Sequence, residues 1–425
     1  MQKAILLFIL FVFVFCFLGI ILIRSPFFQE NYGWRLEAIR ADIKYALDPP
    51  EQIMFTPEKT SQATPMPTIL SPTPTTTIVL ETAEPTPIPT ATFPPTLTPT
   101  PMPESANLTG ILHQFQMWNN CGPANLAMAL SFWGWKGDQR IIADTLKPNP
   151  RDKNIMPYEM ENFVEGQTEL EAVTRVGGDL NTIKAFLSSG FPVIAEKGFE
   201  GVGFDGWMGH YQVVTGYDDN TETLIVQDSY KGPDQIETYQ NFIDQWRAFN
   251  YTYLVPFPPD RRQQVLDILG LQAFDNYNNH YAAQKALEET ASQNERNLYF
   301  AWFNRGSNLV ALQDYTLAAS AYDTAFAIYQ QIPDEQRPWR MMWYQTGPYF
   351  AYYYTGRYQD VINLATTTLD AMSEPILEES YYWRAKANIA IGQSESAIED
   401  LEFCLEAHPD FSPCLTELRN LGIEP

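Results

Sequence analysis

The sequence predicts an α+β domain followed by an all-α repeat region, both placed after an N-terminal apolar helix and a Pro/Thr-rich linker. Three observations lead to this prediction. They are an apolar N-terminal segment, a central stretch in which an amphipathic helix precedes short strands, and a C-terminal part whose helical periodicity repeats. Because the chain has 425 residues, two or three folded units are expected.

The composition argues against several classes of function. The net charge is −24, from 51 acidic and 27 basic residues, and clustered Lys or Arg never combines with aromatic residues. Nucleic-acid binding is therefore not expected. Four cysteines are too few for a disulfide scaffold, and the scattered histidines match no zinc pattern, so neither a metal nor a cofactor is expected.

The N-terminal segment reads as a membrane anchor. Residues 4–23 (AILLFILFVFVFCFLGIILI) carry no charge, and as a helix they would extend roughly 30 Å, the thickness of the bilayer core. The run ends in Arg-Ser-Pro, which is unlike a cleavage site, so residues 1–24 are predicted to be an uncleaved, single-pass signal anchor. Helical spacing in residues 29–47 predicts a short helix within a juxtamembrane segment, residues 25–60.

A linker is predicted at residues 61–106, which are rich in Pro and Thr. This composition favours an extended, solvated and disordered chain that can hold the next domain as much as about 130 Å from the membrane. Similar stalks occur in surface-anchored bacterial proteins. We therefore expect the later domains on the extracellular side of a bacterial membrane, although basic residues after the apolar segment favour the opposite orientation.

Cys121 is the candidate nucleophile. The segment NNCGP at residues 119–123 combines capping residues with a proline in the first helical turn, and apolar residues follow at helical spacing up to Trp133. Cys121 is thereby placed at the N-terminus of a buried helix, where the helix dipole favours the thiolate. A buried structural cysteine is the alternative.

Two short strands, residues 211–215 and 224–226, follow about ninety residues later and are joined by the turn GYDDN. His210 precedes the first strand and Asp228 follows the second, so a hairpin brings their side chains together. With Cys121 they fit a triad in which imidazole takes the thiol proton and a carboxylate orients the imidazole. The glycine-rich residues 198–209 are either a substrate-binding loop or a strand connection.

The ordered motifs QMWNNCGPANLAMAL, GDLNTIKAFLSSGFPVIAE, GHYQVVTGYDD and VQDSY resemble cysteine peptidase family thirty-nine. This papain-like group includes the double-glycine leader peptidases of bacteriocin exporters. The resemblance implies a papain-like fold for the central domain, expected at residues 107–260. It also implies a nucleophile, a base and an orienting acid at Cys121, His210 and Asp228, with a glutamine before the cysteine that stabilises the oxyanion.

Two glutamines, Gln114 and Gln116, lie seven and five residues before Cys121, and neither has the six-residue spacing expected of papain-like enzymes. Gln116 is the preferred candidate. His113 is a rival base in principle, but no acid accompanies it. Exporter-linked relatives also carry an ATP-binding cassette, and because this sequence has no GxxxxGK[ST] loop, leader processing coupled to export is not expected.

Residues 261–425 are predicted to form a superhelix of tetratricopeptide repeats, whose concave face would bind a protein or peptide partner. Three copies are expected, at about residues 302–325, 342–375 and 383–409, after a degenerate helix pair around residues 263–291. Cys404 and Cys414 lie between the last helices. Either a disulfide or two buried thiols would fit there.

Together these features predict a membrane-anchored cysteine peptidase that hydrolyses peptide bonds and binds a partner through its helical repeats. One alternative is a non-hydrolytic, peptide-binding adaptor. Another is an amidase or acyl transferase that uses the same triad on a different acceptor. The substrate and the cleavage preference stay open at this stage.

Overall fold

The structure is a computed structural model of the chain. It describes residues 54–58, 102–149, 151–152, 154–200, 206–372 and 374–424, together with six isolated positions before residue 44. Apart from two of these isolated positions, the predicted membrane helix at residues 4–23 lies outside the described residues, as does the predicted linker up to residue 101. Within the part that is described, no helix is both long enough and apolar enough to cross a bilayer.

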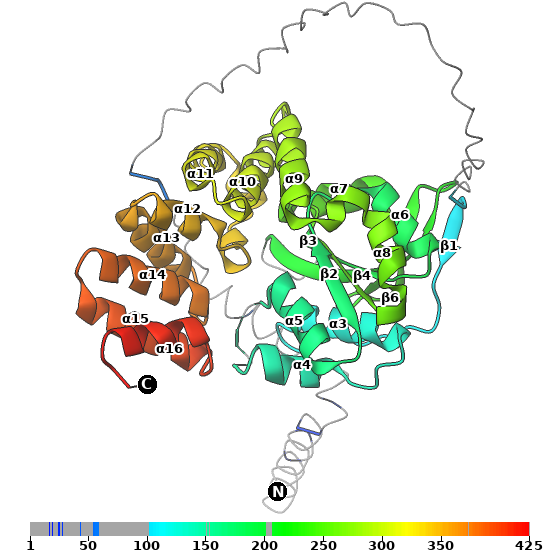
Figure 1. Cartoon of the computed structure of the whole chain (residues 1–425), viewed down its shortest axis with the longest axis horizontal. Helices are drawn as coiled ribbons and strands as arrows, with labels where there is room; N and C mark the ends of the chain where they lie inside the picture. The colour runs from blue at the N-terminus through cyan, green and yellow to red at the C-terminus, as the bar shows by residue number, and fades with distance from the viewer. Residues whose placement is uncertain are drawn as a thin grey trace, which may run out of the picture.

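An α+β domain precedes a helical C-terminal region, and the two lie side by side (Figure 1). The α+β domain is built on a seven-stranded sheet, in which six strands have the order β2-β7-β3-β4-β5-β6 and the seventh, β1, pairs with β4. Every pairing is antiparallel. The strands are β1 (Ser105–Asn107), β2 (Glu171–Arg175), β3 (Val193–Phe199), β4 (Met208–Asp218), β5 (Thr223–Asp228), β6 (Gly232–Thr238) and β7 (Tyr253–Phe257).

Helices cover both faces of the sheet (Figure 1). They are α3 (Cys121–Phe132), α4 (Gln139–Leu146), α5 (Pro157–Gln167), α6 (Leu180–Ser188) and α7 (Tyr239–Trp246). On one face α3 and α5 pack with Ile194 and Val213. On the other face α6 and α7 pack with Val193, Ala195 and Val214. Neighbouring strand residues therefore serve opposite cores, as the two-residue period of a strand requires.

The predicted hairpin is present as β4 and β5, with Val214 opposite Val226, but both strands are longer than predicted. His210 consequently lies inside β4 instead of preceding it, and Asp228 is the last residue of β5. Part of the glycine-rich stretch is strand as well, because Gly198 of β3 pairs with Gly209 of β4. Residues 201–205 lie outside the described residues.

The C-terminal region consists of helices α8 (Arg262–Leu269), α9 (Asp275–Glu289), α10 (Glu295–Ala311), α11 (Tyr315–Tyr329), α12 (Gly347–Tyr354), α13 (Tyr358–Asp370), α14 (Glu378–Ala390), α15 (Ser394–Ala407) and α16 (Ser412–Asn420). Short 3-10 helices link the elements: η1 (Arg247–Phe249), η2 (Pro259–Arg261), η3 (Gly270–Ala273), η4 (Asp334–Gln336) and η5 (Met341–Trp343). Helix pairs thus occupy the three predicted repeat segments. Their assignment as tetratricopeptide repeats stays a prediction.

The three helix pairs turn in the same way. The turn residue has a positive φ in each pair: 63° at Gln313, 74° at Gly356 and 82° at Gly392. Two of the three positions carry glycine, which adopts this conformation without steric cost. The close packing within the first pair depends on Gly306, where a Cβ would lie 2.7 Å from the ring of Tyr322.

A disulfide joins Cys404 of α15 to Cys414 of α16. Of the two arrangements that the sequence left open, the bonded one is present.

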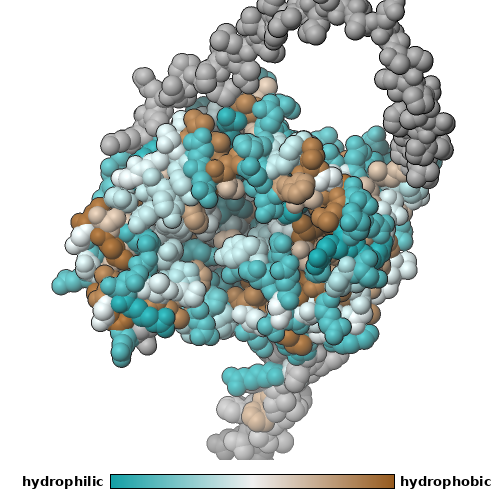
Figure 2. All heavy atoms as spheres, in the orientation of Figure 1, coloured by the Kyte–Doolittle hydropathy of each residue, from teal (hydrophilic) through white to brown (hydrophobic). Residues whose placement is uncertain are grey.

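A buried junction connects the α+β domain to the helical region. The indole of Trp207 stacks on the ring of Phe249 and contacts Tyr344, and Arg340 Nη1 donates to the Trp207 carbonyl over 2.8 Å. Figure 2 shows a surface of mixed polar and apolar patches that is hollowed between the two regions. Because Trp207 lies only three residues before His210, the helical region supports the start of β4.

Candidate active site

The N-terminus of α3 presents the thiol of Cys121. This residue is the first of the helix, is 8% exposed, and carries a free thiol. Asn119, two residues earlier, has a positive φ of 54° and donates from Nδ2 to the Asp152 carbonyl over 3.0 Å. Gly122 leaves room for the side chain of Ile155, since a Cβ there would lie 2.6 Å from Cγ1 of Ile155. These contacts explain why the chain enters α3 through the sequence NNCGP.

His210 and Asp228 face each other across the β4/β5 hairpin, both buried, with 3.1 Å between Nε2 and Oδ1. Gln212 Nε2 donates to the other carboxylate oxygen over 2.6 Å. The backbone N–H groups of Tyr230 and Lys231 donate to Oδ1 over 2.7 and 2.9 Å. With four donors around it, the Asp228 carboxylate is fixed in one orientation and in turn fixes the imidazole.

Two opposing effects set the protonation of this pair. Burial lowers the pKa of His210, but the charge and hydrogen bond of Asp228, together with contact to Cys121, outweigh it and raise the pKa to about 9. Burial raises the pKa of Asp228, but the interaction with His210 outweighs it and holds this pKa well below the ordinary value. His210 is therefore cationic at neutral pH. Since Asp228 engages Nε2, Nδ1 is the ring nitrogen left for the thiol of Cys121.

A chain of hydrogen bonds links Gln116 to the same site. Asn125 Nδ2, one turn after Cys121, donates to the Cys121 carbonyl over 2.8 Å, to the Tyr211 carbonyl over 2.7 Å and to Ser229 Oγ over 2.9 Å. Ser229 Oγ then donates to Gln116 Oε1 over 2.9 Å. Because its amide oxygen is occupied in this way, Gln116 has its amide nitrogen left to act as a donor.

The other two candidates before Cys121, Gln114 and His113, have different contacts. Gln114 Oε1 accepts from the backbone N–H of Gln139, the first residue of α4, over 3.1 Å. Gln114 is thus held on α4, whereas Gln116 is held on Ser229, the neighbour of Asp228. His113 Nε2 lies 3.0 Å from the Asp228 carbonyl oxygen, so it contacts the backbone of the acid and not its carboxylate.

Glu196 is a buried acid beside the site that sequence reasoning missed. It lies in β3, opposite Tyr211 of β4, and accepts from the Tyr211 hydroxyl over 3.1 Å. Burial raises its pKa to about 8 and the nearby Cys121 adds to the increase, while the hydrogen bond from Tyr211 opposes it. The carboxyl is therefore neutral at pH 7. The only sequence signal was a lone acid within the apolar strand FPVIAE.

A cavity of about 320 Å³ lies between the α+β domain and the helical region. Phe199 and Trp207 contribute to its wall from the α+β domain, and Arg296 and Phe300 contribute from α10. The ring of Phe199 also lies 5.1 Å from the ring of His210. Phe199 thus lies between this cavity and the histidine, and none of Cys121, His210 and Asp228 lines the cavity.

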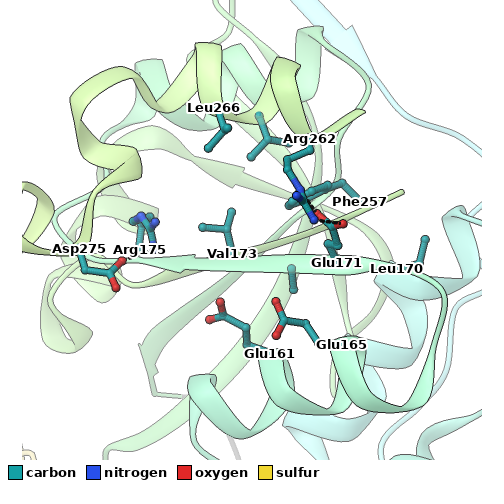
Figure 3. Close-up of a pocket in the computed structure, with 12 residues that line it drawn as sticks. Glu161, Glu165, Leu170, Glu171, Val173, Arg175, Phe257, Arg262, Leu266 and Asp275 are labelled. Carbon is teal, nitrogen blue, oxygen red and sulfur yellow. Dashed lines mark hydrogen bonds and ion pairs between the residues drawn. The ribbon is translucent and has the colours of Figure 1, made fainter. Parts of the chain in front are cut away.

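A second pocket, of about 540 Å³, lies at the edge strand β2 (Figure 3). Glu161 and Glu165 of α5 line it on one side of the strand. Its arginines are already paired, Arg262 with Glu171 and Arg175 with Asp275. None of the predicted site residues lines this pocket. Across the described ranges, no group of three His, Cys, Asp or Glu side chains is arranged to hold a metal ion.

Comparisons with known proteins were made at the level of structure and of sequence. Two similar solved structures are a protein from Bacillus anthracis named as a C39-like peptidase and the peptidase domain of Streptococcus ComA, a bi-functional ABC transporter involved in a quorum-sensing pathway. The first is 16% identical with a TM-score of 0.30, covering 36% of this chain and 98% of that one. The second is 17% identical with a TM-score of 0.28, covering 35% and 98%.

No curated protein matches the chain. Residues 109–254, about a third of the sequence, match the Peptidase_C39 like family. The central part of the chain is thus an α+β, papain-like C39 domain, and a helical C-terminal region follows it.

Proposed function

We propose that the chain is a cysteine peptidase in which Cys121 is the nucleophile, His210 the general base and Asp228 the orienting acid. The observation that carries the proposal is the buried ion pair of His210 and Asp228 next to a free thiol at a helix N-terminus. A carboxylate that fixes one imidazole nitrogen leaves the other to hold the thiol proton, which is the arrangement that thiol peptidases require.

The reaction follows from these positions. In the resting pair the His210 imidazolium holds at Nδ1 the proton that Cys121 Sγ has released, and the thiolate attacks the carbonyl carbon of a peptide bond. The oxyanion that forms accepts hydrogen bonds from the amide nitrogen of Gln116 and from the N–H groups of Cys121 and Gly122, which start α3 and have no partner within the helix. The imidazolium then protonates the leaving amine, an acyl-enzyme remains, and water hydrolyses it with His210 as base.

The chain is further proposed to be a single-pass membrane protein with both folded regions outside a bacterial cell. The apolar residues 4–23 and the Pro/Thr-rich linker support this placement. The Cys404–Cys414 disulfide supports it as well, because such bonds persist in oxidising compartments. Digestion of intact cells by an added protease tests it, since both folded regions should then be accessible.

Alkylation of Cys121 tests the proposed chemistry. The full chain is treated with limiting iodoacetamide between pH 5 and pH 9, and modification of Cys121 is quantified by mass spectrometry in folded and denatured protein. In the folded wild type, rapid alkylation is expected well below the pKa of about 8.5 of a free thiol. His210→Ala should abolish the advantage, and Asp228→Asn should reduce it.

If folded Cys121 reacts no faster than the same residue in the denatured chain, the peptidase proposal is wrong and the adaptor alternative takes its place. If it reacts rapidly, incubation with a peptide library separates the remaining possibilities. New amino termini indicate a peptidase. Transfer of an acyl group to an added amine indicates a transferase.

A further inference from the structure

A short segment before the linker lies against the helical region, far from its neighbours in sequence. Residues 54–58 (Met-Phe-Thr-Pro-Glu) run beside α12 and α13, where Figure 1 shows them in blue. Phe55 is 6% exposed and Pro57 is buried, whereas the three other side chains are exposed. The segment therefore makes a specific contact in which two residues anchor it.

The anchor of this contact is an aromatic ring in a pocket. The centroid of the Phe55 ring lies 4.9 Å from that of Phe326 of α11, edge to face, and 6.1 Å from that of Tyr352 of α12. Leu364 of α13 lines the same pocket, in which a cavity of about 50 Å³ remains, so the ring nearly fills the space. Buried aromatic side chains are the usual anchors of peptide recognition.

Polar contacts hold the segment on either side of the ring. Gln330 Nε2 donates to Thr56 Oγ1 over 2.9 Å, and the backbone N–H of Glu58 donates to Asp360 Oδ1 over 2.8 Å. Arg357 Nε donates to the other oxygen of Asp360 over 2.7 Å. Arg357 therefore holds in place the Asp360 carboxylate, which accepts the hydrogen bond from the backbone of the segment.

We propose that α11, α12 and α13 form a peptide-binding site whose resident ligand is the chain's own segment 54–58. The ligand class is a short, extended segment with phenylalanine and, two residues later, proline. Proline restricts the free segment to extended conformations, which lowers the entropy lost on binding. The site does not depend on the chemistry of Cys121.

This docking changes what the linker does. Residue 58 is held on the helical region, while residue 102 leads into β1 of the α+β domain, so residues 59–101 begin and end on the folded body. The distance of about 130 Å expected between the membrane and the α+β domain therefore requires release of the segment. A competing peptide of the same class would release it.

Binding of a labelled peptide tests the proposal. A fluorescein-labelled peptide with the sequence of residues 51–60 is titrated with full-length wild type, Phe55→Ala and Met54→Ala, and anisotropy is measured. Because a tethered segment competes at an effective concentration of order millimolar, the peptide is expected to bind the Phe55→Ala chain about tenfold or more tightly than the wild type. Met54 is exposed, so Met54→Ala should behave as the wild type does.

A peptide in which alanine replaces the phenylalanine should fail to bind the Phe55→Ala chain. Equal binding to all three chains, or to none of them, would overturn the proposal. A photoreactive benzoylphenylalanine at position 55 gives independent evidence on the intact chain. Crosslinks to α11 or α13 within one chain are expected at nanomolar concentration, and crosslinks only between chains would show that the segment does not dock on its own helical region.

Discussion

Ser229 has a single hydroxyl that connects two amides of the site. It accepts from Asn125 and donates to Gln116. Under the proposed mechanism, Ser229→Ala leaves Gln116 without the contact that orients its donor. Acylation by p-nitrophenyl acetate, which passes through an oxyanion, is expected to slow about tenfold more than alkylation by iodoacetamide, which does not.

The matched control is Ser380→Ala. Ser380 is equally buried, and its hydroxyl bonds to that of Tyr349 in the helical region, so it loses a comparable contact away from the thiol. Ser380→Ala should change neither the rate of acylation nor the rate of alkylation. Equal slowing of acylation and alkylation in Ser229→Ala would assign Ser229 a merely structural role.

Glu196 makes stability depend on pH. Its pKa rises from 4.5 in the unfolded chain to about 8 in the fold, mainly through burial. Between these values the folded chain holds a proton that the unfolded chain releases, so the stabilisation present below pH 4.5 is lost as pH rises towards 8. Glu196→Gln removes this dependence. Relative to the variant, the wild type should lose up to about 5 kcal/mol of unfolding free energy over that range.

Urea unfolding at pH 5, 6, 7 and 8 measures this difference. Gln retains a carbonyl oxygen for the Tyr211 hydroxyl, so Glu196→Gln keeps the hydrogen bond while removing the charge. A difference between the two proteins that stays constant with pH would contradict the assignment of a neutral carboxyl.

The sequence singled out Cys121, His210 and Asp228 as candidates because local pattern predicted a helix start at the first and strand boundaries at the other two, although His210 lies inside β4. Local pattern carries no information on Asn125 or Ser229. Their roles depend on hydrogen bonds between residues more than a hundred positions apart, such as Ser229 with Gln116. Such contacts become visible only when α3 and the β4/β5 hairpin are packed together.

At the scale of elements, the start of α3 depends on a glycine. A Cβ at position 122 would lie 2.6 Å from Cγ1 of Ile155, so Gly122→Ala must displace the buried side chain of Ile155 or the start of α3. We expect a loss of about 1–3 kcal/mol in unfolding free energy and slower alkylation of Cys121. Gly166 of α5 is the matched control, since a Cβ there meets nothing within 4 Å, and Gly166→Ala should stabilise by up to about 1 kcal/mol. Equal thermal stabilities of the two variants would contradict this account.

Strands β3 and β4 show what the apolar pattern misses. The predicted strand 211–215 began only after the glycine-rich residues 198–209, but backbone pairing of β3 with β4 continues through Gly198 and Gly209. A Cβ at Gly209 would lie 2.8 Å from Phe249 and 3.0 Å from Tyr344. These glycines make room for aromatic rings of the junction with the helical region. The sequence alone could not reveal this, because Tyr344 lies far along the chain.

For the whole molecule, the sequence predicted separate regions and did not identify the residues through which α10 and the α+β domain meet. The junction is nevertheless extensive and polar as well as aromatic. The amides of Asn250 and Asn308 exchange two hydrogen bonds, of 2.8 and 3.1 Å, and Asn304 Nδ2 donates to the Arg247 carbonyl over 2.7 Å. Buried polar groups that are satisfied only across a junction favour one relative placement of the two regions.

The helical region should therefore stabilise the strand that carries His210, and Arg340 provides the test. Arg340→Met leaves the buried Trp207 carbonyl without its donor, which should cost about 1–3 kcal/mol. Amide hydrogen exchange, followed by mass spectrometry, is expected to accelerate in residues 208–212 of β4. Arg384, whose partner Asp400 lies within the helical region, is the matched control. Arg384→Met should destabilise its own helices and leave exchange in β4 unchanged. Unchanged β4 exchange in Arg340→Met would instead mean that the α+β domain holds its histidine without help from the helices.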